Sequence, residues 1–207
     1  MNKTAYRVVY YMHVRITEKG EFTMSGIFGK TNNTKSNGGK LMYTIDDMAA
    51  AVRRFLVEKE LVFSDRRLSE NAVLIELGVN YDSISLKVRI ILENKPMCCR
   101  LDVVMPICAD KLYAYPLCRL IVKENFDKRL GCIKYNESSG ELLYQYAFLT
   151  SNGMNMDDFG HSLLATIGSS ASVYNELRRF AVGKFKSSEI SEIIETSDAL
   201  IRDISEN

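Results

Sequence analysis

The feature that most constrains this chain is a strict alternation of side chains over residues 84–93, whose sequence is ISLKVRIILE. Ile84, Leu86, Val88, Ile90 and Leu92 occupy one parity, and mostly polar residues occupy the other. A period of two is the repeat of a β-strand, and one polar face is typical of strands in antiparallel sheets. The run therefore predicts a sheet with one buried surface and one solvent-facing surface.

The flanking sequence predicts further strands and helices joined by short links, which favour neighbours in space. An α+β fold follows: an antiparallel sheet with helices packed on one face, in the order α-β-β-β-α-β-β-α. An N-terminal β-hairpin and an extra C-terminal helix extend it. The expected elements are a hairpin within 6–28, a helix at 45–59, strands at 72–79, 84–93 and 98–107, a helix within 110–128, a hairpin at 132–135 and 142–150, a long helix after Asn155 and a last helix from about Ser188.

Two of these helices begin with good capping residues. Thr44 is the expected N-cap of the first helix, with Asp46 and Asp47 in its first turn. Asn155 is the expected N-cap of the long helix, where the Asp157-Asp158 pair follows. Anionic side chains are stabilising in a first helical turn, so both acidic pairs are interpreted as capping groups rather than paired catalytic carboxylates.

The stretch from Lys30 to Lys40 contains no apolar residue and predicts a flexible linker. It divides the chain into a hairpin with linker (1–40), an α+β domain (41–185) and a C-terminal amphipathic helix (186–207). The last helix carries six acidic residues against Arg202 alone. Its acidic side is interpreted as a solvated surface, and the alternative is a docking strip for the basic linker.

Composition excludes several classes of protein. The net charge is +1 and the 27 cationic residues balance 26 acidic ones, so a broadly basic nucleic-acid binder is not expected. No run of about 18 uncharged apolar residues is present, so no membrane span is expected. The N-terminus lacks the apolar core of a signal peptide, and the five cysteines lie within apolar stretches. These features favour reduced thiols and a cytoplasmic location.

No set of residues favours a metal site, a cofactor site or catalysis. Cys98 and Cys99 are adjacent, so they point to opposite faces of a strand, and no C-x-x-C motif occurs. Cys98 lies on the expected polar face and is the thiol most open to reagents. A nucleophilic site built from Cys132 or Cys99 with His161 and Asp157 has no supporting spacing. Gly38-Gly39-Lys40 lacks the spacing of a phosphate-binding loop. A non-enzymatic protein without cofactors is therefore expected.

The order of elements in residues 45–180, about two-thirds of the chain, resembles the YbjN-type family, whose fold is that of the type III secretion chaperones. The closest stretch is 117–149, in which a helix with Asn125 is followed by a strand led by Gly131. An acidic turn containing Gly140 then leads into an aromatic-rich strand with Glu141 and Tyr144. The N-terminal hairpin and the acidic last helix depart from the family pattern.

The resemblance implies a homodimeric, non-enzymatic protein of the bacterial cytoplasm, with a chaperone-like or regulatory role. Its partner would be a protein or peptide segment held on the sheet or on a helical face. The alternative is an immunity or antitoxin-like protein that buries one face against a single cognate protein. The expected partner-binding surface consists of polar-face and aromatic residues of three strands: Lys87, Arg89, Arg100, Asp102, Tyr144 and Tyr146.

Overall fold

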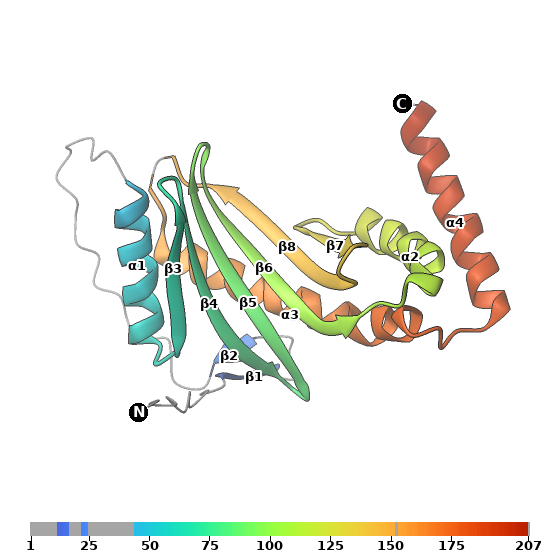
Figure 1. The fold of residues 1–207 in the computed structure, drawn as a ribbon, viewed down its shortest axis with the longest axis horizontal. Helices are drawn as coiled ribbons and strands as arrows, with labels where there is room; N and C mark the ends of the chain where they lie inside the picture. Colours follow the sequence, from blue (N-terminus) through green and yellow to red (C-terminus); the bar gives the residue numbers. More distant parts are fainter. Residues whose placement is uncertain (1–11, 17–21, 25–43, 152, 207) are drawn as a thin grey trace, which may run out of the picture.

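The computed structural model describes residues 12–16, 22–24, 44–151 and 153–206 (Figure 1). It confirms the expected α+β class. The described helices are α1 (Ile45–Glu58), α2 (Ala114–Phe126), α3 (Met156–Ala181) and α4 (Ser187–Glu206), with a short 3₁₀ turn at Lys111–Tyr113. The described strands are β1 (Met12–Ile16), β2 (Phe22–Met24), β3 (Phe63–Ser69), β4 (Ala72–Tyr81), β5 (Ile84–Asn94), β6 (Met97–Cys108), β7 (Cys132–Asn136) and β8 (Glu141–Leu149).

The main part of the sheet is antiparallel, in the order β3-β4-β5-β6-β8-β7. Consecutive strands from β3 to β6 are neighbours, as their short connections predict. α2 then carries the chain to β7 at the edge, and β8 returns between β7 and β6 (Figure 1). This placement makes β6 and β8 long central partners and leaves β7 as a short edge strand.

β3 is an additional strand that the alternation of apolar residues did not predict. Its sequence, FSDRRLS, places an acidic and two basic residues in the middle of the strand, and most of its side chains are exposed. It forms because its backbone pairs with β4, from Phe63 opposite Leu77 to Arg67 opposite Val73. Charged residues are common on edge strands, where they oppose pairing with other chains.

The N-terminal hairpin is confirmed where the chain is described, since β1 and β2 pair antiparallel from Val14 to Ile16. β1 also pairs in parallel with the end of β4, with Met12 opposite Val79. The hairpin is therefore part of the same sheet. The remainder of the expected hairpin and the linker at 30–40 lie outside the described residues.

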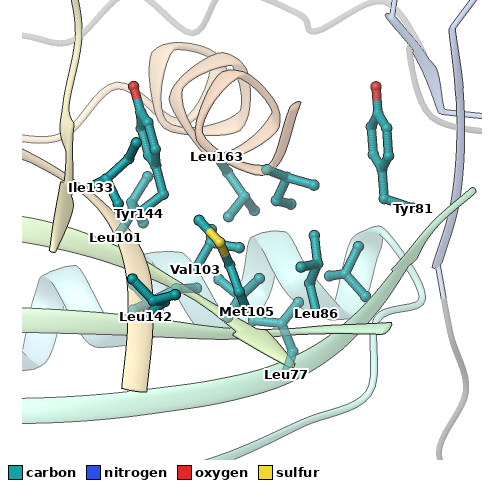
Figure 2. Close-up of a cluster of buried hydrophobic side chains, with 14 of the residues drawn as sticks. Leu77, Tyr81, Leu86, Leu101, Val103, Met105, Ile133, Leu142, Tyr144 and Leu163 are labelled. Atoms are coloured by element: carbon teal, nitrogen blue, oxygen red, sulfur yellow. The ribbon is translucent and has the colours of Figure 1, made fainter. Parts of the chain in front are cut away.

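The core lies between one face of the sheet and the helices, and α1, α2 and α3 all contribute buried side chains to it. Alternate residues of the central strands point to one side, where Leu77, Leu86, Leu101, Val103 and Leu142 are buried (Figure 2). Leu163 of α3 contributes to the same cluster. Burial of each such side chain stabilises the fold by about 1.5–3 kcal/mol. The predicted parity of β5 is thus confirmed, with its apolar side facing the helices.

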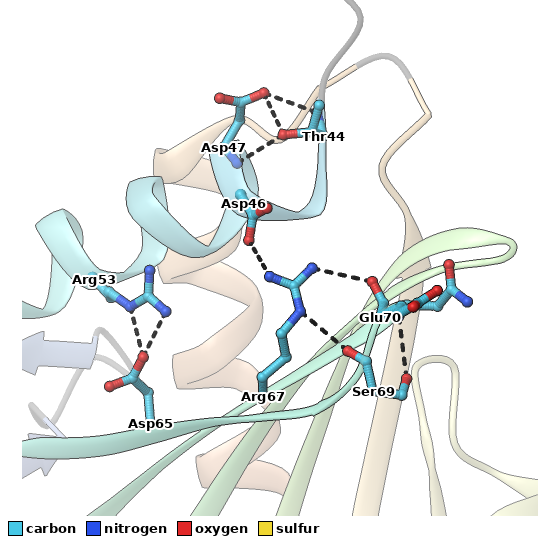
Figure 3. Close-up of polar contacts among 9 residues, drawn as sticks. Thr44, Asp46, Asp47, Arg53, Asp65, Arg67, Ser69 and Glu70 are labelled. Atoms are coloured by element: carbon cyan, nitrogen blue, oxygen red, sulfur yellow. Dashed lines mark hydrogen bonds and ion pairs between the residues drawn. The ribbon is translucent and has the colours of Figure 1, made fainter.

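α1 begins as its sequence predicts. The Thr44 hydroxyl accepts a hydrogen bond from the Asp47 backbone N–H, and the Asp47 carboxylate accepts one from the Thr44 backbone N–H (Figure 3). This reciprocal capping box satisfies two N–H groups that a helix start leaves free. Ion pairs from Arg53 to Asp65 (2.6 Å) and from Arg67 to Asp46 (2.8 Å) connect α1 to β3.

α1 and α3 cover the same face of the sheet and touch each other. The rings of Phe55 and Phe159 meet edge to face, with 5.3 Å between their centroids. Gly160 allows this approach, because a Cβ atom there would lie 3.0 Å from the Phe55 ring. The predicted helical layer on one face is therefore present, and these two helices leave the opposite face of the sheet uncovered.

α2 and α4 form a second group of helices at the end of the sheet near β7. Pro116 lies in the first turn of α2, as expected for a residue without an N–H. α4 packs on α2, with Ile193 of α4 buried in the core cluster and an ion pair of 2.7 Å between Arg119 and Asp198. Figure 1 shows that α4 stands beyond α2 and that its C-terminal end points away from the sheet.

Candidate protein-binding surface

The face of the sheet turned away from α1 and α3, here called the open face, carries a row of polar residues across four strands. The strand register places Glu76 opposite Arg89, Arg89 opposite Asp102, and Asp102 opposite Gln145. Residues directly opposite in an antiparallel sheet point to the same side. Among the described residues no helix packs on this side, so the polar row lies on the surface of the molecule.

Arg89 is the centre of an ion-pair network in this row. Its two terminal nitrogens donate to the two carboxylate oxygens of Glu141, at 2.9 and 3.0 Å. Its Nε lies 3.7 Å from Glu76 Oε1, and the Lys87 ammonium lies 2.7 Å from the same oxygen. The hydrogen bond from Lys87 holds the pKa of Glu76 below its usual value, and the bond to Glu141 raises the pKa of Arg89. A two-pronged Arg–carboxylate contact fixes both side chains in one geometry.

Asp102 forms the second polar contact of the open face. Only 5% of this residue is exposed, although it lies on the side away from the core. The Gln145 amide donates a hydrogen bond of 2.7 Å to Asp102 Oδ1, and Arg100 Nε lies 3.4 Å from Oδ2. Arg100 also lies 3.7 Å from the Glu93 carboxylate. A carboxylate this poorly hydrated requires such partners, because burial without them is costly.

A small apolar cluster lies beside the charged row. Leu74 and Ile91 are opposite each other on β4 and β5, and both are buried although neither belongs to the main core. Arg100 is the cross-strand neighbour of Ile91 on β6. The open face therefore combines two covered apolar residues with fixed charges of both signs.

The structure brings together four of the six residues expected at a partner-binding surface. Lys87, Arg89, Arg100 and Asp102 all lie on the open face. Their acidic partners Glu76, Glu93 and Glu141 were not predicted from the sequence to lie on this surface, since their contacts depend on strand register. The polar parity of β8, which contains Glu141 and Gln145, is the sequence signal that indicates this face.

Tyr144 and Tyr146 lie on the opposite side of β8, toward α3. Tyr144 is in the core, its hydroxyl donates to the Leu130 carbonyl, and burial raises its pKa. Tyr146 is half-buried beside Phe148, with ring centroids 5.7 Å apart. These tyrosines therefore do not contribute to the open face, because Asp102 pairs with Gln145 and the aromatic parity of β8 faces the helices.

The cysteines and His161 do not form a catalytic or metal-binding cluster among the described residues. All five cysteines are free thiols, and Cys99 is buried in the core. Cys98 is half-buried on the open face with its sulfur 3.5 Å from Glu93, and burial together with this carboxylate raises its pKa. Cys108 and Cys118 are the exposed thiols, so the expectation that Cys98 is the thiol most open to reagents is wrong. His161 and Asp157 are exposed on α3, whereas Cys99 lies beneath that helix in the core. No group of three or more His, Cys, Asp or Glu side chains among the described residues is arranged to hold a metal ion.

Comparisons with known proteins add no assignment: the chain matches no protein-family model, no curated protein and no solved structure. Within the described ranges, every helix is too short or too polar to cross a membrane. The open face and its charges are therefore the features that bear on function.

Proposed function

We propose that this protein is a non-enzymatic protein-binding module with a chaperone-like or regulatory role. Its open face holds a partner segment, and the chain works as a homodimer in the cytoplasm. The observation that carries the proposal is the fixed array of Arg89, Arg100 and Asp102 on a sheet face without a covering helix among the described residues. The five free thiols are consistent with a reducing compartment.

The ion pairs of the open face support binding through their rigidity. Arg89 and Glu141 are each less than one-third exposed and share a two-pronged contact, so their side chains are already held in one conformation. A partner that covers them loses less side-chain entropy than it would on freely rotating residues. Charges of both signs then select a partner segment with complementary charges in register.

The proposal is tested by capture of partners from a lysate of the native organism, using the tagged full chain. We expect a partner that is retained by the wild-type protein and reduced at least about fivefold by Lys87→Ala and by Arg100→Ala. Arg178→Ala is the matched control, since Arg178 is an exposed cation on α3, on the helical side. Circular dichroism establishes that each variant is folded.

The number of captured partners separates two roles. Several partners lost together from the two open-face variants support a chaperone-like module. A single stoichiometric partner supports the immunity or antitoxin-like alternative. Capture that is unchanged in both open-face variants contradicts the assignment of this face.

A further inference from the structure

The outer edge of β8 is only partly covered by β7. Pairing between these two strands extends from Asn136–Glu141 to Cys132–Gln145. On the other side of β8, β6 remains paired as far as Leu149. Residues 146–149 of β8, with the sequence YAFL, therefore have no strand on their outer side among the described residues. This segment is called the free edge of β8.

The backbone groups of the free edge point outward at two positions. The Thr150 N–H donates to the Met97 carbonyl on the β6 side, at 3.0 Å. Successive residues of a strand turn their N–H and C=O groups alternately to the two neighbours. Ala147 and Leu149 therefore present these groups to the outer side, where a further strand would pair with them.

Two other edges of the sheet, those at β7 and β3, are protected against such pairing. Beside β7, the Asn125 side chain accepts from the Ile133 N–H at 2.7 Å and donates to the Ile133 carbonyl at 3.0 Å, in place of a strand. β3 carries charges in its centre, and Asp65 and Arg67 are ion-paired to α1. The free edge of β8 has neither device, and it contains no charged residue.

The side chains of the free edge are apolar and accessible. Leu149 is 71% exposed, and Ala147 is also exposed on the same side. On the side of α3, Tyr146 borders a shallow apolar hollow together with Leu130 and Ala165. A strand added at this edge would therefore cover apolar surface on both sides of the sheet.

We propose that the free edge of β8 pairs antiparallel with the same segment of a second copy and forms the homodimer contact. This inference rests on the proposed homodimer and names its surface. A two-fold axis at Phe148 brings Ala147 of each copy opposite Leu149 of the other, so the outward N–H and C=O groups exchange main-chain hydrogen bonds.

The register is limited by β7. An axis at Ala147 would bring Leu149 of the second copy opposite Gln145, a position that Cys132 occupies. With the axis at Phe148, Leu149, the last residue of β8, lies opposite Ala147, so the paired strands stop short of the position that Cys132 occupies. The two Phe148 side chains then become direct cross-strand neighbours, which is a favourable aromatic pair. Because the segment carries no charge, pairing with an identical copy creates no like-charge repulsion.

Sedimentation equilibrium of the full chain tests the proposal. We expect a reversible monomer–dimer equilibrium for the wild-type protein, and a dissociation constant raised at least about tenfold by Leu149→Lys. The substitution opposes edge pairing without removing buried surface, since Leu149 is exposed. Leu112→Lys is the matched control, because Leu112 is 81% exposed near the start of α2 and should leave the dissociation constant unchanged.

Ala147→Pro is the second variant, since it removes an outward N–H that β6 does not use, and edge strands accept proline. It should weaken the dimer as Leu149→Lys does. A wild-type chain that remains monomeric at about 100 µM overturns both this contact and the homodimer. A dimer that resists both substitutions overturns this contact alone, as does equal weakening by Leu112→Lys.

Discussion

At the scale of single residues, the open face depends on carboxylates held by neighbours from other strands. Asp102 is almost fully covered. Its carboxylate contacts Gln145, its cross-strand neighbour on β8, and Arg100, which lies two residues earlier on β6. Glu76 is shared between Lys87 and Arg89. Apart from the Arg100 contact, which lies within β6, each of these contacts joins adjacent strands, so protonation or removal of one carboxylate weakens the sheet as well as the binding surface.

Glu76 gives a prediction about pH. Its pKa in the folded protein is lowered, chiefly by the hydrogen bond from Lys87. A carboxylate with a lowered pKa stabilises the fold above its unfolded pKa of about 4.3, and this contribution is lost as the pH falls through the folded pKa. Stability of the wild-type protein should therefore fall below about pH 5 more steeply than that of Glu76→Gln.

The measurement is urea unfolding of both proteins at a series of pH values. Lys87→Met is the matched second variant, because it removes the largest cause of the shift while retaining Glu76. Its pH dependence should also be shallower than that of the wild-type protein. If the free energy of unfolding depends on pH in the same way for the wild type and Glu76→Gln, the contact between Lys87 and Glu76 does not contribute to stability.

At the scale of secondary-structure elements, the edge strands of the sheet differ in how they are protected from pairing with a further strand. β3 carries charges, β7 is closed by the Asn125 side chain, and only part of β8 is covered. Sequence periodicity identified β7 and β8 but not β3, because the Asp-Arg-Arg centre of β3 has no apolar alternation. This segment becomes a strand because its backbone pairs with β4, and that pairing exists only in the folded chain.

Asn125 is expected to stabilise the β7 edge. Asn125→Ala leaves the N–H and C=O of Ile133 without this partner and should cost about 1–3 kcal/mol of unfolding free energy. Hydrogen exchange at the Ile133 amide should accelerate in the same variant. Asn175→Ala, at an exposed position on α3, is the control and should change stability by about 0.5 kcal/mol or less. An Ile133 amide that exchanges at the wild-type rate would contradict this role.

At the scale of the whole molecule, the helices are divided between two locations. α1 and α3 bury the core side of the sheet, whereas α2 and α4 pack together near β7 (Figure 1). This division leaves the open face and the free edge of β8 without a described helix over them. The surface proposed for dimerisation adjoins the open face, since Ala147 is the cross-strand neighbour of Arg100, and a dimer through β8 would extend the open face across both copies.

The contribution of α4 packing to stability is tested by the same substitution, Ile to Ala, at a buried and at an exposed position of this helix. Ile193 is 5% exposed against α2 and Ile201 is 42% exposed. Ile193→Ala should lower the unfolding free energy by about 2–4 kcal/mol, because it leaves a cavity in the contact. Ile201→Ala should lower it by about 0.5 kcal/mol or less. Equal losses in urea unfolding would mean that α4 does not depend on this contact.

The amino-acid sequence by itself determined the elements whose side chains repeat with the period of a strand or a helix. The alternation in β5, the Thr44 cap of α1 and the turn before β8 are local, since they depend on chain geometry over a few residues. Tertiary structure decided what is not local: the pairing of β3 and β1 with β4, and the meeting of Arg89 with Glu141, 52 residues apart. The side of β8 on which Tyr144 lies belongs to this second group, because strand register fixes which residues share a face.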